Sequence, residues 1–398
     1  MTNDNSDGIL DIFDKVVKTD PKSNSIKCNS TILTYGELNI LVNKIANNLS
    51  LKLKKICDKK NINNTIPILL DKSHFTVASI IAIWKLGLSC VIINKLINKD
   101  NFEFVINTIK PIIIIDSDFI AELDNLDKAF ENPINKDKYI GINDLALICF
   151  TSGTTGQAKS VMIDYKQISI ACKNIEEEFI KYLPKSLTLA LTPSFSSIVG
   201  ILNTFGLIFA KGCLHIISDE KVTDLVYLTE YIKYNKIAGA FFPPYLAIKF
   251  LNHGNGILDC LFVGTDKVSN LYSSKTTIIN IYGSTETIGF SSFFVIDKLY
   301  INTPIGKPTD NTKIYILDDN LKKVKRGEIG EIYISNSLSL GYLNNEKLTK
   351  KKFIANPYST SNDDRVLYKT EDLGYYNENN DIVYHSRKDF IYYFNFNE

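Results

Sequence analysis

One short run of the sequence combines glycines, hydroxyls and a lysine in the way that phosphate binding requires. The apolar stretch at residues 145–150 leads directly into TSGTTGQAKS at residues 151–160. Gly153 and Gly156 allow close backbone approach and positive φ, and Lys159 adds a charge-assisted hydrogen bond worth about 1.5–3 kcal/mol. The hydroxyls that can donate to phosphate oxygens belong to Thr151, Ser152, Thr154 and Thr155. The composition of this loop predicts a polyphosphate ligand.

The spacing of the loop separates it from the best-known phosphate motif. A Walker A loop needs four residues between its first glycine and its Gly-Lys pair, whereas Gly153, Gly156 and Lys159 follow one another at intervals of three. A kinase or P-loop NTPase is therefore disfavoured. If the loop stood alone, a polar turn without any ligand would be the better interpretation.

The elements around this loop alternate in a regular way. Apolar runs of strand length alternate with longer amphipathic segments through the first three quarters of the chain, which predicts parallel sheets covered by helices. The expected strands are residues 65–70, 90–93, 112–115, 145–150, 187–191, 214–217, 238–242, 258–263 and 277–281. The expected helices are residues 38–51, 75–86, 167–182, 223–234 and 245–251.

After about residue 300 the pattern changes to short strands separated by Gly, Asn and Asp. The expected strands in this part are residues 312–317, 330–334, 373–377 and 382–385. The sequence therefore predicts a β-rich unit after an α/β unit.

Length and composition describe an ordinary globular chain. At about 150 residues per domain, 398 residues predict two to three domains, and the net charge of +1 gives no overall field toward nucleic acid or an anionic membrane. The seven cysteines include no CxxC pair, which favours a reducing, cytosolic environment over a disulfide framework or a zinc site. The polar, acidic start MTNDNSDG does not have the pattern of a secretory signal. The apolar stretches at residues 77–93 and 202–217 are each interrupted by a lysine, so we expect a buried helix and strand in each and no membrane span.

Several other runs of the sequence, taken together with the loop, occur along the chain in an order that is typical of one family. They are LTYGELN at residues 33–39, NIYGSTE at 280–286, PIGKPTDNTKIYILD at 304–318, GEIGEIYI at 327–334, LGYLN at 340–344 and YKTEDLG at 368–374. Together with the loop they resemble the adenylate-forming (ANL) superfamily of AMP-binding enzymes, which includes acyl-CoA synthetases, luciferases and the adenylation domains of nonribosomal peptide synthetases. LTYGELN, NIYGSTE and the PIG run resemble the peptide-synthetase domains more than CoA ligases.

The resemblance implies the large N-terminal domain of that superfamily, with a mixed α/β fold. The expected fold has two stacked α/β lobes with parallel-type sheets, together with a smaller β-rich subdomain of distorted-barrel type. We expect the lobes, with phosphate loop and acid pocket, in residues 1–302, the β-rich subdomain in 303–384 and a hinge region in 385–398. The family's mobile C-terminal domain, of on the order of a hundred residues, is expected to be absent from this chain, either by truncation or because it is supplied in trans.

The resemblance also assigns roles to individual residues. Tyr282 would stack near an adenine, Thr285 would contact the α-phosphate, and Glu286 would hold Mg2+, a cation that prefers oxygen ligands. Asp372 would accept the two ribose hydroxyls, and Arg387 would also reach the ribose. With Lys159 these residues imply that a substrate carboxylate attacks the α-phosphorus of ATP, giving an acyl adenylate and pyrophosphate. Positioning and charge neutralisation carry such chemistry, so no nucleophilic side chain is required.

The sequence departs from the family pattern at several positions. The replacements are Ala158 for a proline, Ser160 for a glycine, Tyr165 for a histidine, and Glu371 and Ser386 for glycines. None of them removes a charged catalytic group, although slower turnover is a reasonable expectation.

The acid pocket departs in a more informative way. Where α-amino acid domains place an aspartate for the substrate ammonium, the run FSSIVG at residues 195–200 has Ser196. Burying an ammonium without a carboxylate costs several kcal/mol, so we expect an acid that lacks the α-ammonium and has an aryl, keto or aliphatic body, unless Asp266 or a partner supplies the charge. The residues expected around the acyl group, where glycines would make room and phenylalanines an apolar wall, are Ser196, Ser197, Gly200, Phe241, Phe262, Gly264, Ile281, Gly289 and Phe290.

The sequence therefore predicts an ATP- and Mg2+-dependent domain that activates a small-molecule carboxylic acid for loading onto a carrier protein. An acyl-CoA or aryl-CoA ligase, with CoA as acceptor, is the enzymatic alternative. A degenerate nucleotide-binding protein without turnover is an alternative of a different class. Neither nucleic acid nor a membrane is an expected partner.

Overall fold

The computed structural model describes residues 8–56, 64–134, 144–151, 158–183 and 186–388. The chain forms two compact units, which we call unit 1 (Met1–Glu176 with Ser186–Val222) and unit 2 (Glu177–Lys185 with Thr223–Glu398). The domain boundary expected at residue 302 lies within unit 2 and stays a prediction.

Unit 1 contains two groups of parallel strands, each with an antiparallel strand at one side. The first has the order β3-β4-β5-β6, in which β3, β4 and β5 are parallel and β6 folds back onto β5. In the second, β7, β8 and β1 are parallel, and β2 is antiparallel to β1. The strands are β1 (Asn24–Cys28), β2 (Thr31–Thr34), β3 (Thr65–Ile68), β4 (Ser89–Ile92), β5 (Leu145–Thr151), β6 (Lys159–Asp164), β7 (Thr188–Leu191) and β8 (Cys213–Ile216). The predicted parallel-type sheets are confirmed.

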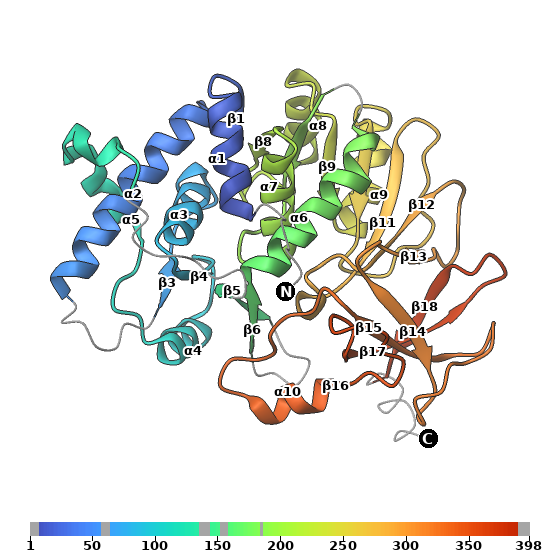
Figure 1. Cartoon of the computed structure of the whole chain (residues 1–398). Coiled ribbons are helices and arrows are strands. Elements are labelled where there is room, and N and C mark those ends of the chain that lie inside the picture. The colour runs from blue at the N-terminus through green and yellow to red at the C-terminus, as the bar shows by residue number, and fades with distance from the viewer. Residues whose placement is uncertain (1–7, 57–63, 135–143, 152–157, 184–185, 389–398) are drawn as a thin grey trace. The chain divides into compact units, whose positions relative to one another are not determined.

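Helices accompany these strands along the chain (Figure 1). They are α1 (Ile9–Thr19), α2 (Tyr35–Ile56), α3 (His74–Lys85), α4 (Lys99–Ile109), α5 (Ser117–Ala121), α6 (Tyr165–Phe179) and α7 (Ile198–Phe209), with short 3-10 turns at Glu122–Asn125, Lys128–Glu131 and Ile180–Tyr182. The LTYGELN run begins α2 with a capping box, because Thr34 N–H donates to Glu37 at 2.8 Å and Glu37 N–H donates to the Thr34 hydroxyl at 3.2 Å. Nine of the twelve residues of α3 are buried, as expected for a helix inside the core. The two apolar stretches are thus a buried helix followed by a strand in each case, α3 with β4 and α7 with β8.

The strand expected at residues 112–115 does not form. α4 ends in a left-handed residue, Lys110 with φ 48°, and Pro111 lacks the N–H that a strand would use. The segment reaches the sheet only through a bridge between Ile68 and Ile115.

Unit 2 contains a mixed group of strands and an antiparallel sheet. β9, β10 and β11 are parallel, β12 is antiparallel to β11, and β13 is antiparallel to β12. The second sheet is antiparallel in the order β14-β15-β17-β16, with β18 also paired to β17. The elements are α8 (Leu225–Tyr234), β9 (Gly239–Phe242), α9 (Pro244–Gly254), β10 (Cys260–Val263), β11 (Thr277–Tyr282), a 3-10 turn at Thr285–Thr287, β12 (Ser292–Ile296), β13 (Lys307–Pro308), β14 (Lys313–Leu317), β15 (Gly330–Ser335), α10 (Glu346–Lys352), β16 (Phe353–Ala355), β17 (Val366–Tyr376) and β18 (Ile382–Arg387).

The antiparallel sheet has its own hydrophobic core, which explains why the sequence changes to short apolar strands after about residue 300. Isoleucines from β14, β15 and β18 pack together with Ile305, and Tyr282 packs against this cluster. The β-rich character expected after residue 300 is confirmed. Since β9, β10 and β11 are parallel, their carboxyl ends lie at one edge, which is where ligands bind in open α/β sheets.

Candidate functional site

A cavity of about 310 Å³ lies within unit 2 at the carboxyl ends of β10 and β11. Its lining comes from the loop after β10, the end of β11 with the loop that follows, and the two strands β17 and β18. The lining residues are Thr265, Asp266, Lys267, Val268, Asn280, Ile281, Tyr282, Gly283, Ser284, Thr303, Ile305, Asp372, Tyr384 and Arg387. The three residues that the sequence analysis assigned to adenine and ribose, Tyr282, Asp372 and Arg387, all line this one cavity.

These three side chains are held together by direct contacts. The Tyr282 hydroxyl donates to Asp372 Oδ2 at 2.6 Å, and Arg387 Nη1 lies 3.5 Å from Asp372 Oδ1. The ladder pairs Asp372 on β17 with Arg387 on β18, which explains how residues 15 apart meet. Burial, followed by the charge of Asp372, raises the pKa of Tyr282 well above its ordinary value, so the phenol remains a donor to the carboxylate.

A second acidic side chain lies beside Asp372. Glu371 Oε2 is 2.5 Å from Lys352 Nζ and 3.5 Å from Arg387 Nη2. From the sequence, Glu371 is only a replacement for glycine, and Lys352 has no predicted role. No sequence signal joins these two residues, since Lys352 ends a lysine-rich helix whose composition is typical of a solvated one.

Glu286 is buried, with 7% of its surface exposed, in the 3-10 turn that follows β11. The Tyr342 hydroxyl donates to Glu286 Oε1 at 2.7 Å, and Ser339 N–H donates to the Glu286 carbonyl at 2.8 Å. Burial and then the charge of Glu286 raise the pKa of Tyr342. Tyr342 belongs to the LGYLN run, so the motif was visible in the sequence but its contact with Glu286 was not. Thr285 precedes Glu286 in the same turn and is half-buried.

The loop that we expect to bind phosphate follows β5 and precedes β6 in the sequence, and these two strands pair as a hairpin in unit 1. Thr151 at the end of β5 pairs with Lys159 at the start of β6. Strand, loop and lysine therefore follow one another as the sequence predicts. The other predicted loop residues lie outside the described part of the chain; they are Ser152, Gly153, Thr154, Thr155 and Gly156.

In unit 1 the predicted pocket residues Ser196, Ser197 and Gly200 build the start of α7. The Ser197 hydroxyl caps the helix by accepting from Gly200 N–H at 3.2 Å, and it donates to the Ser194 carbonyl at 2.8 Å. The hydroxyls of Ser194 and Ser196 lie 2.9 Å apart. The serine at position 196 therefore has a neutral hydroxyl partner.

In unit 2 the remaining predicted pocket residues lie on or after β9, β10 and β11. Phe262 and Phe241 are register partners on adjacent strands, and both are buried. The rings of Phe262 and Phe290 both pack against Phe179, with centroids 5.1 and 4.6 Å away. Phe179 ends α6 and was not predicted, because from the sequence it is only one apolar position of an amphipathic helix. Phe179, Phe262 and Phe290 form an aromatic cluster, and the expected role of the phenylalanines around an acyl group stays a prediction.

The glycines do not make room in the way expected from the sequence. A methyl group at Gly264 would lie 2.6 Å from the Ile281 carbonyl oxygen, and one at Gly200 would lie 2.1 Å from the Ser194 carbonyl oxygen. Gly289 has φ 71°, a left-handed conformation. These glycines permit close backbone approach or positive φ, and the space at Gly200 and Gly264 is already filled by the chain's own backbone.

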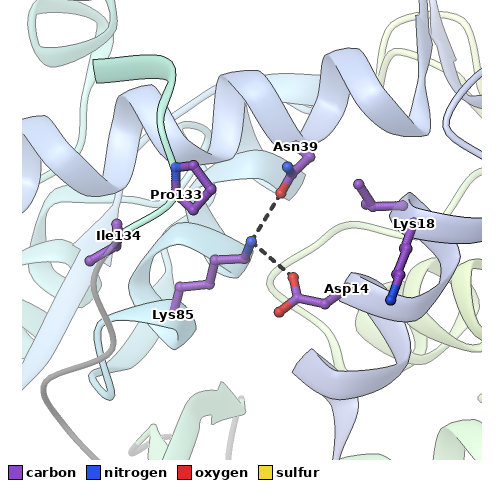
Figure 2. Close-up of a pocket in the computed structure, with 7 residues that line it drawn as sticks. Asp14, Lys18, Asn39, Lys85, Pro133 and Ile134 are labelled. Carbon is purple, nitrogen blue, oxygen red and sulfur yellow. Dashed lines mark hydrogen bonds and ion pairs between the residues drawn. The ribbon is translucent and has the colours of Figure 1, made fainter. Parts of the chain in front are cut away.

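A second cavity, of about 240 Å³, lies in unit 1 and is lined by α1, α2, Lys85 and residues 133–134. Figure 2 shows the Lys85 amine between Asn39 and Asp14, at 2.9 Å from Asn39 Oδ1 and 3.0 Å from Asp14 Oδ1. Its ring contact with Phe13, at 5.3 Å, completes the surroundings of the amine. This lysine joins three helices, which is a structural role.

Two features of the described residues bear on which ligands the site could hold. Among the described residues, no group of three or more His, Cys, Asp or Glu side chains could hold a metal ion. Glu286 offers a buried carboxylate oxygen donor, which is the ligand type Mg2+ accepts alongside substrate phosphates. In the cavity, the Thr303 hydroxyl is buried and has no hydrogen-bond partner in the described structure, so a polar ligand could satisfy it.

No helix in the described ranges is long and apolar enough to cross a membrane.

Comparison with known proteins gives one consistent result. A family model described as "AMP-binding enzyme" matches residues 13–343. The chain is 28% identical to malpinin synthetase of Mortierella alpina over 95% of its length, and 28% identical to gramicidin S synthase 1 of Brevibacillus brevis over 96% of its length. It spans 5% of the first protein and 36% of the second.

Solved structures share the fold. An artificially fused adenylation–PCP di-domain NRPS from Klebsiella oxytoca, NpsA-ThdA, has a TM-score of 0.83 at 22% identity, covering 96% of this chain and 79% of the other. The N-terminal subdomain of Klebsiella oxytoca NpsA, in complex with 3-hydroxyanthranilyl-AMSN, has a TM-score of 0.82 at 23% identity, covering 96% and 100%.

Proposed function

The chain belongs to the AMP-binding enzyme family, and on that premise we propose that it activates a carboxylic acid with ATP, forming an acyl adenylate and pyrophosphate. One observation carries the proposal: Tyr282, Asp372 and Arg387 meet at one cavity of about 310 Å³ at the carboxyl ends of parallel strands. Such a cavity fits a nucleoside better than it fits a metal or an extended polymer.

We assign binding and orienting roles to this chain's residues. Tyr282 and Arg387 hold the Asp372 carboxylate, whose remaining lone pairs can accept the two hydroxyls of a ribose. Thr285 is assigned to the α-phosphate, and Lys159 with the hydroxyls and N–H groups of its loop to the phosphates. Because the hairpin β5–β6 fixes Thr151 opposite Lys159, the loop between them starts and ends at a defined place.

Glu286 is the residue that would hold Mg2+. Bound there, the cation would offset the negative charge of the phosphates. Tyr342 holds the Glu286 carboxylate at 2.7 Å and so fixes the direction of the second oxygen. With one protein carboxylate, this site depends on substrate oxygens for the remaining ligands.

In the proposed reaction an oxygen of the substrate carboxylate attacks the α-phosphorus of ATP. The new P–O bond gives the acyl adenylate, and the bond to the β-phosphate oxygen breaks, so that pyrophosphate carries away the displaced electron pair. No proton transfer is needed at this step, because the attacking carboxylate is already ionised. Orientation of the reactants and neutralisation of charge by Lys159 are the chain's contributions.

We propose that the acid lacks an α-ammonium group and has an aryl body. The position that would hold a counter-ion is Ser196, whose hydroxyl lies 2.9 Å from that of Ser194. The aromatic cluster of Phe179, Phe262 and Phe290 would offer an apolar surface to an aryl ring. The NpsA subdomain structures that share the fold are complexes with 3-hydroxyanthranilyl-AMSN and 3-hydroxybenzoyl-AMSN, in both of which the acyl group is an aryl group.

We propose a carrier-protein thiol as the acceptor, with a C-terminal domain acting in trans. The support is the resemblance to synthetases and to the fused adenylation–PCP structure. We further propose a cytoplasmic location, since the six cysteines in the described ranges are free thiols.

The test is acid-dependent exchange of labelled pyrophosphate into ATP, using aryl, keto, fatty and amino acids. We expect exchange with one aryl acid. The Asp372→Asn variant serves as the matched control, because it keeps the shape of the side chain at position 372 and removes its negative charge. Exchange with ordinary L-amino acids alone would refute the proposed acid class. ATP binding by calorimetry without any exchange, even with a C-terminal domain added, would favour a nucleotide-binding protein that has lost turnover.

A further inference from the structure

Glu371 lies in a bulge of β17. The ladder pairs Lys369 with Tyr333 and Leu373 with Glu331, so three residues of β17 stand opposite one residue of β15. Glu371 has φ 65°, a left-handed conformation that favours glycine over a residue with a side chain. In a regular strand, neighbouring side chains point to opposite faces. The bulge is what allows Glu371 and Asp372, adjacent in sequence, to contact the same cation.

The contacts form a chain of alternating charge. Lys352, with 6% of its side chain exposed, pairs with Glu371 at 2.5 Å, and Glu371 pairs with Arg387 at 3.5 Å. Arg387 lies 3.5 Å from Asp372, which accepts from Tyr282 at 2.6 Å. Of these five residues, only Asp372, Arg387 and Tyr282 line the cavity. Glu371 and Lys352 therefore influence the cavity only through their contacts with the residues that line it.

The shared arginine explains what this chain of contacts can do. Arg387 faces two carboxylates, one on each side of its guanidinium, so neither holds it at the distance of about 2.7–2.9 Å that a tight Arg–carboxylate pair has. If Glu371 lost its charge, Asp372 would attract Arg387 without competition from this neighbouring carboxylate. Asp372 would then spend its acceptor lone pairs on a bidentate ion pair rather than on a ligand's hydroxyls.

We propose that Glu371 is a positioning residue for nucleotide recognition, which it serves by drawing Arg387 partly away from Asp372 and leaving that carboxylate available to a ribose diol. The inference rests on the proposed function, because it requires that the cavity binds a nucleotide. It also gives the replacement of glycine by Glu371 a purpose, since a strained backbone is retained where the side chain makes contacts.

The experiment measures the Kd of ATP and of 2′-deoxy-ATP by calorimetry on the whole chain. We expect Glu371→Gln to weaken ATP binding by about tenfold, which corresponds to about 1.4 kcal/mol. We also expect the preference for ATP over 2′-deoxy-ATP to shrink in this variant, because Asp372 no longer reads the ribose. Glu371→Gly, which accepts the left-handed backbone without strain, should bind ATP as weakly as Glu371→Gln.

A double variant separates positioning from a structural role. Lys352→Met alone should destabilise the fold, because it leaves Glu371 without its buried partner, and Lys352→Met with Glu371→Gln should recover that stability. We expect ATP binding to stay weak in the double variant. The inference would be overturned if either Glu371→Gln or the double variant bound ATP with wild-type affinity or kept the wild-type preference for ATP over 2′-deoxy-ATP. Either outcome would leave the proposed function intact. Failure of the wild-type chain to bind ATP would overturn both.

Discussion

Replacing Tyr342 by phenylalanine tests whether Glu286 is present as a buried, hydrogen-bonded carboxylate. The phenol and the carboxylate are 3% and 7% exposed and meet at 2.7 Å. A hydrogen bond to a charged group contributes about 1.5–3 kcal/mol, and its loss leaves the buried acceptor with one partner fewer. We therefore expect Tyr342→Phe to lower the free energy of unfolding by about 2 kcal/mol, measured by urea denaturation at pH 7.

Tyr358 provides the matched control in the same unit. Its hydroxyl donates to the Leu321 carbonyl at 2.8 Å, a neutral acceptor, so Tyr358→Phe should cost only about 0.5–1.5 kcal/mol. Equal losses for Tyr342→Phe and Tyr358→Phe would refute the assignment of a charged Glu286.

The pH dependence of this loss gives a second readout. Burial and the Glu286 charge raise the pKa of Tyr342 above its ordinary value of 10.0. A group whose pKa is higher in the folded state contributes its full stability below the unfolded pKa and loses it as the pH rises. The difference between wild type and Tyr342→Phe should stay constant from pH 7 to 9 and shrink above pH 10. A difference that grows above pH 10 would contradict this reasoning.

Three further predictions follow from burial. Burial lowers the pKa of His215 to about 4, so between pH 6.5 and 4 the unfolded chain binds a proton that the folded chain does not. The free energy of unfolding of the wild type should therefore fall by about 3 kcal/mol as the pH falls from 6.5 to 4. His215→Gln should lose less over the same range, as measured by urea denaturation. Burial also lowers the pKa of Lys72 to about 8, so stability should rise by about 2 kcal/mol between pH 8 and 10, and Lys72→Met should remove that rise. Gly264→Ala would place a methyl group 2.6 Å from the Ile281 carbonyl oxygen and should destabilise by about 1–3 kcal/mol, whereas an unchanged urea midpoint would show that β10 and β11 tolerate the shift.

Much of the fold could be predicted because its signals are local. The apolar runs at residues 145–150 and 258–263 give β5 and β10, and the helix expected at residues 38–51 lies within α2, which begins three residues earlier at Tyr35 behind the Thr34–Glu37 capping box. The strand expected at residues 112–115 failed for an equally local reason, since Lys110 and Pro111 prevent the chain from entering a ladder. Apolar composition alone could not weigh that backbone effect against strand propensity.

Much less of the site could be predicted, because its contacts join distant segments. Tyr282 and Asp372 are 90 residues apart, and Glu286 and Tyr342 are 56 apart. Their residue types indicate nucleotide and cation chemistry, but the pairing depends on how β11 meets β17 and on the register of β17 with β18. The sequence motifs predict the acceptor carboxylates Asp372 and Glu286, whereas only the structure shows that Tyr282 and Tyr342 donate hydrogen bonds to them.

The glycines show the same limit from the opposite direction. From the sequence, Gly264 and Gly200 are equally consistent with an open pocket and with close backbone packing, because both require the absence of a side chain. The nearest backbone oxygens settle the matter, at 2.6 and 2.1 Å from the position of a methyl group. A small residue in a specificity region therefore predicts space only when no backbone lies behind it.

Glu371 is the reverse case, in which a side chain occupies a position suited to glycine. The left-handed backbone favours glycine over a residue with a side chain. The carboxylate is nevertheless matched by Lys352, which is almost fully buried and would itself be strongly destabilising without a partner. The two residues therefore depend on each other, and replacing either one alone is worse than replacing both. Such a coupled pair can persist only if the intermediate state is tolerated or the pair has a use, and the contact of Glu371 with Arg387, which lines the cavity, is the use that we propose.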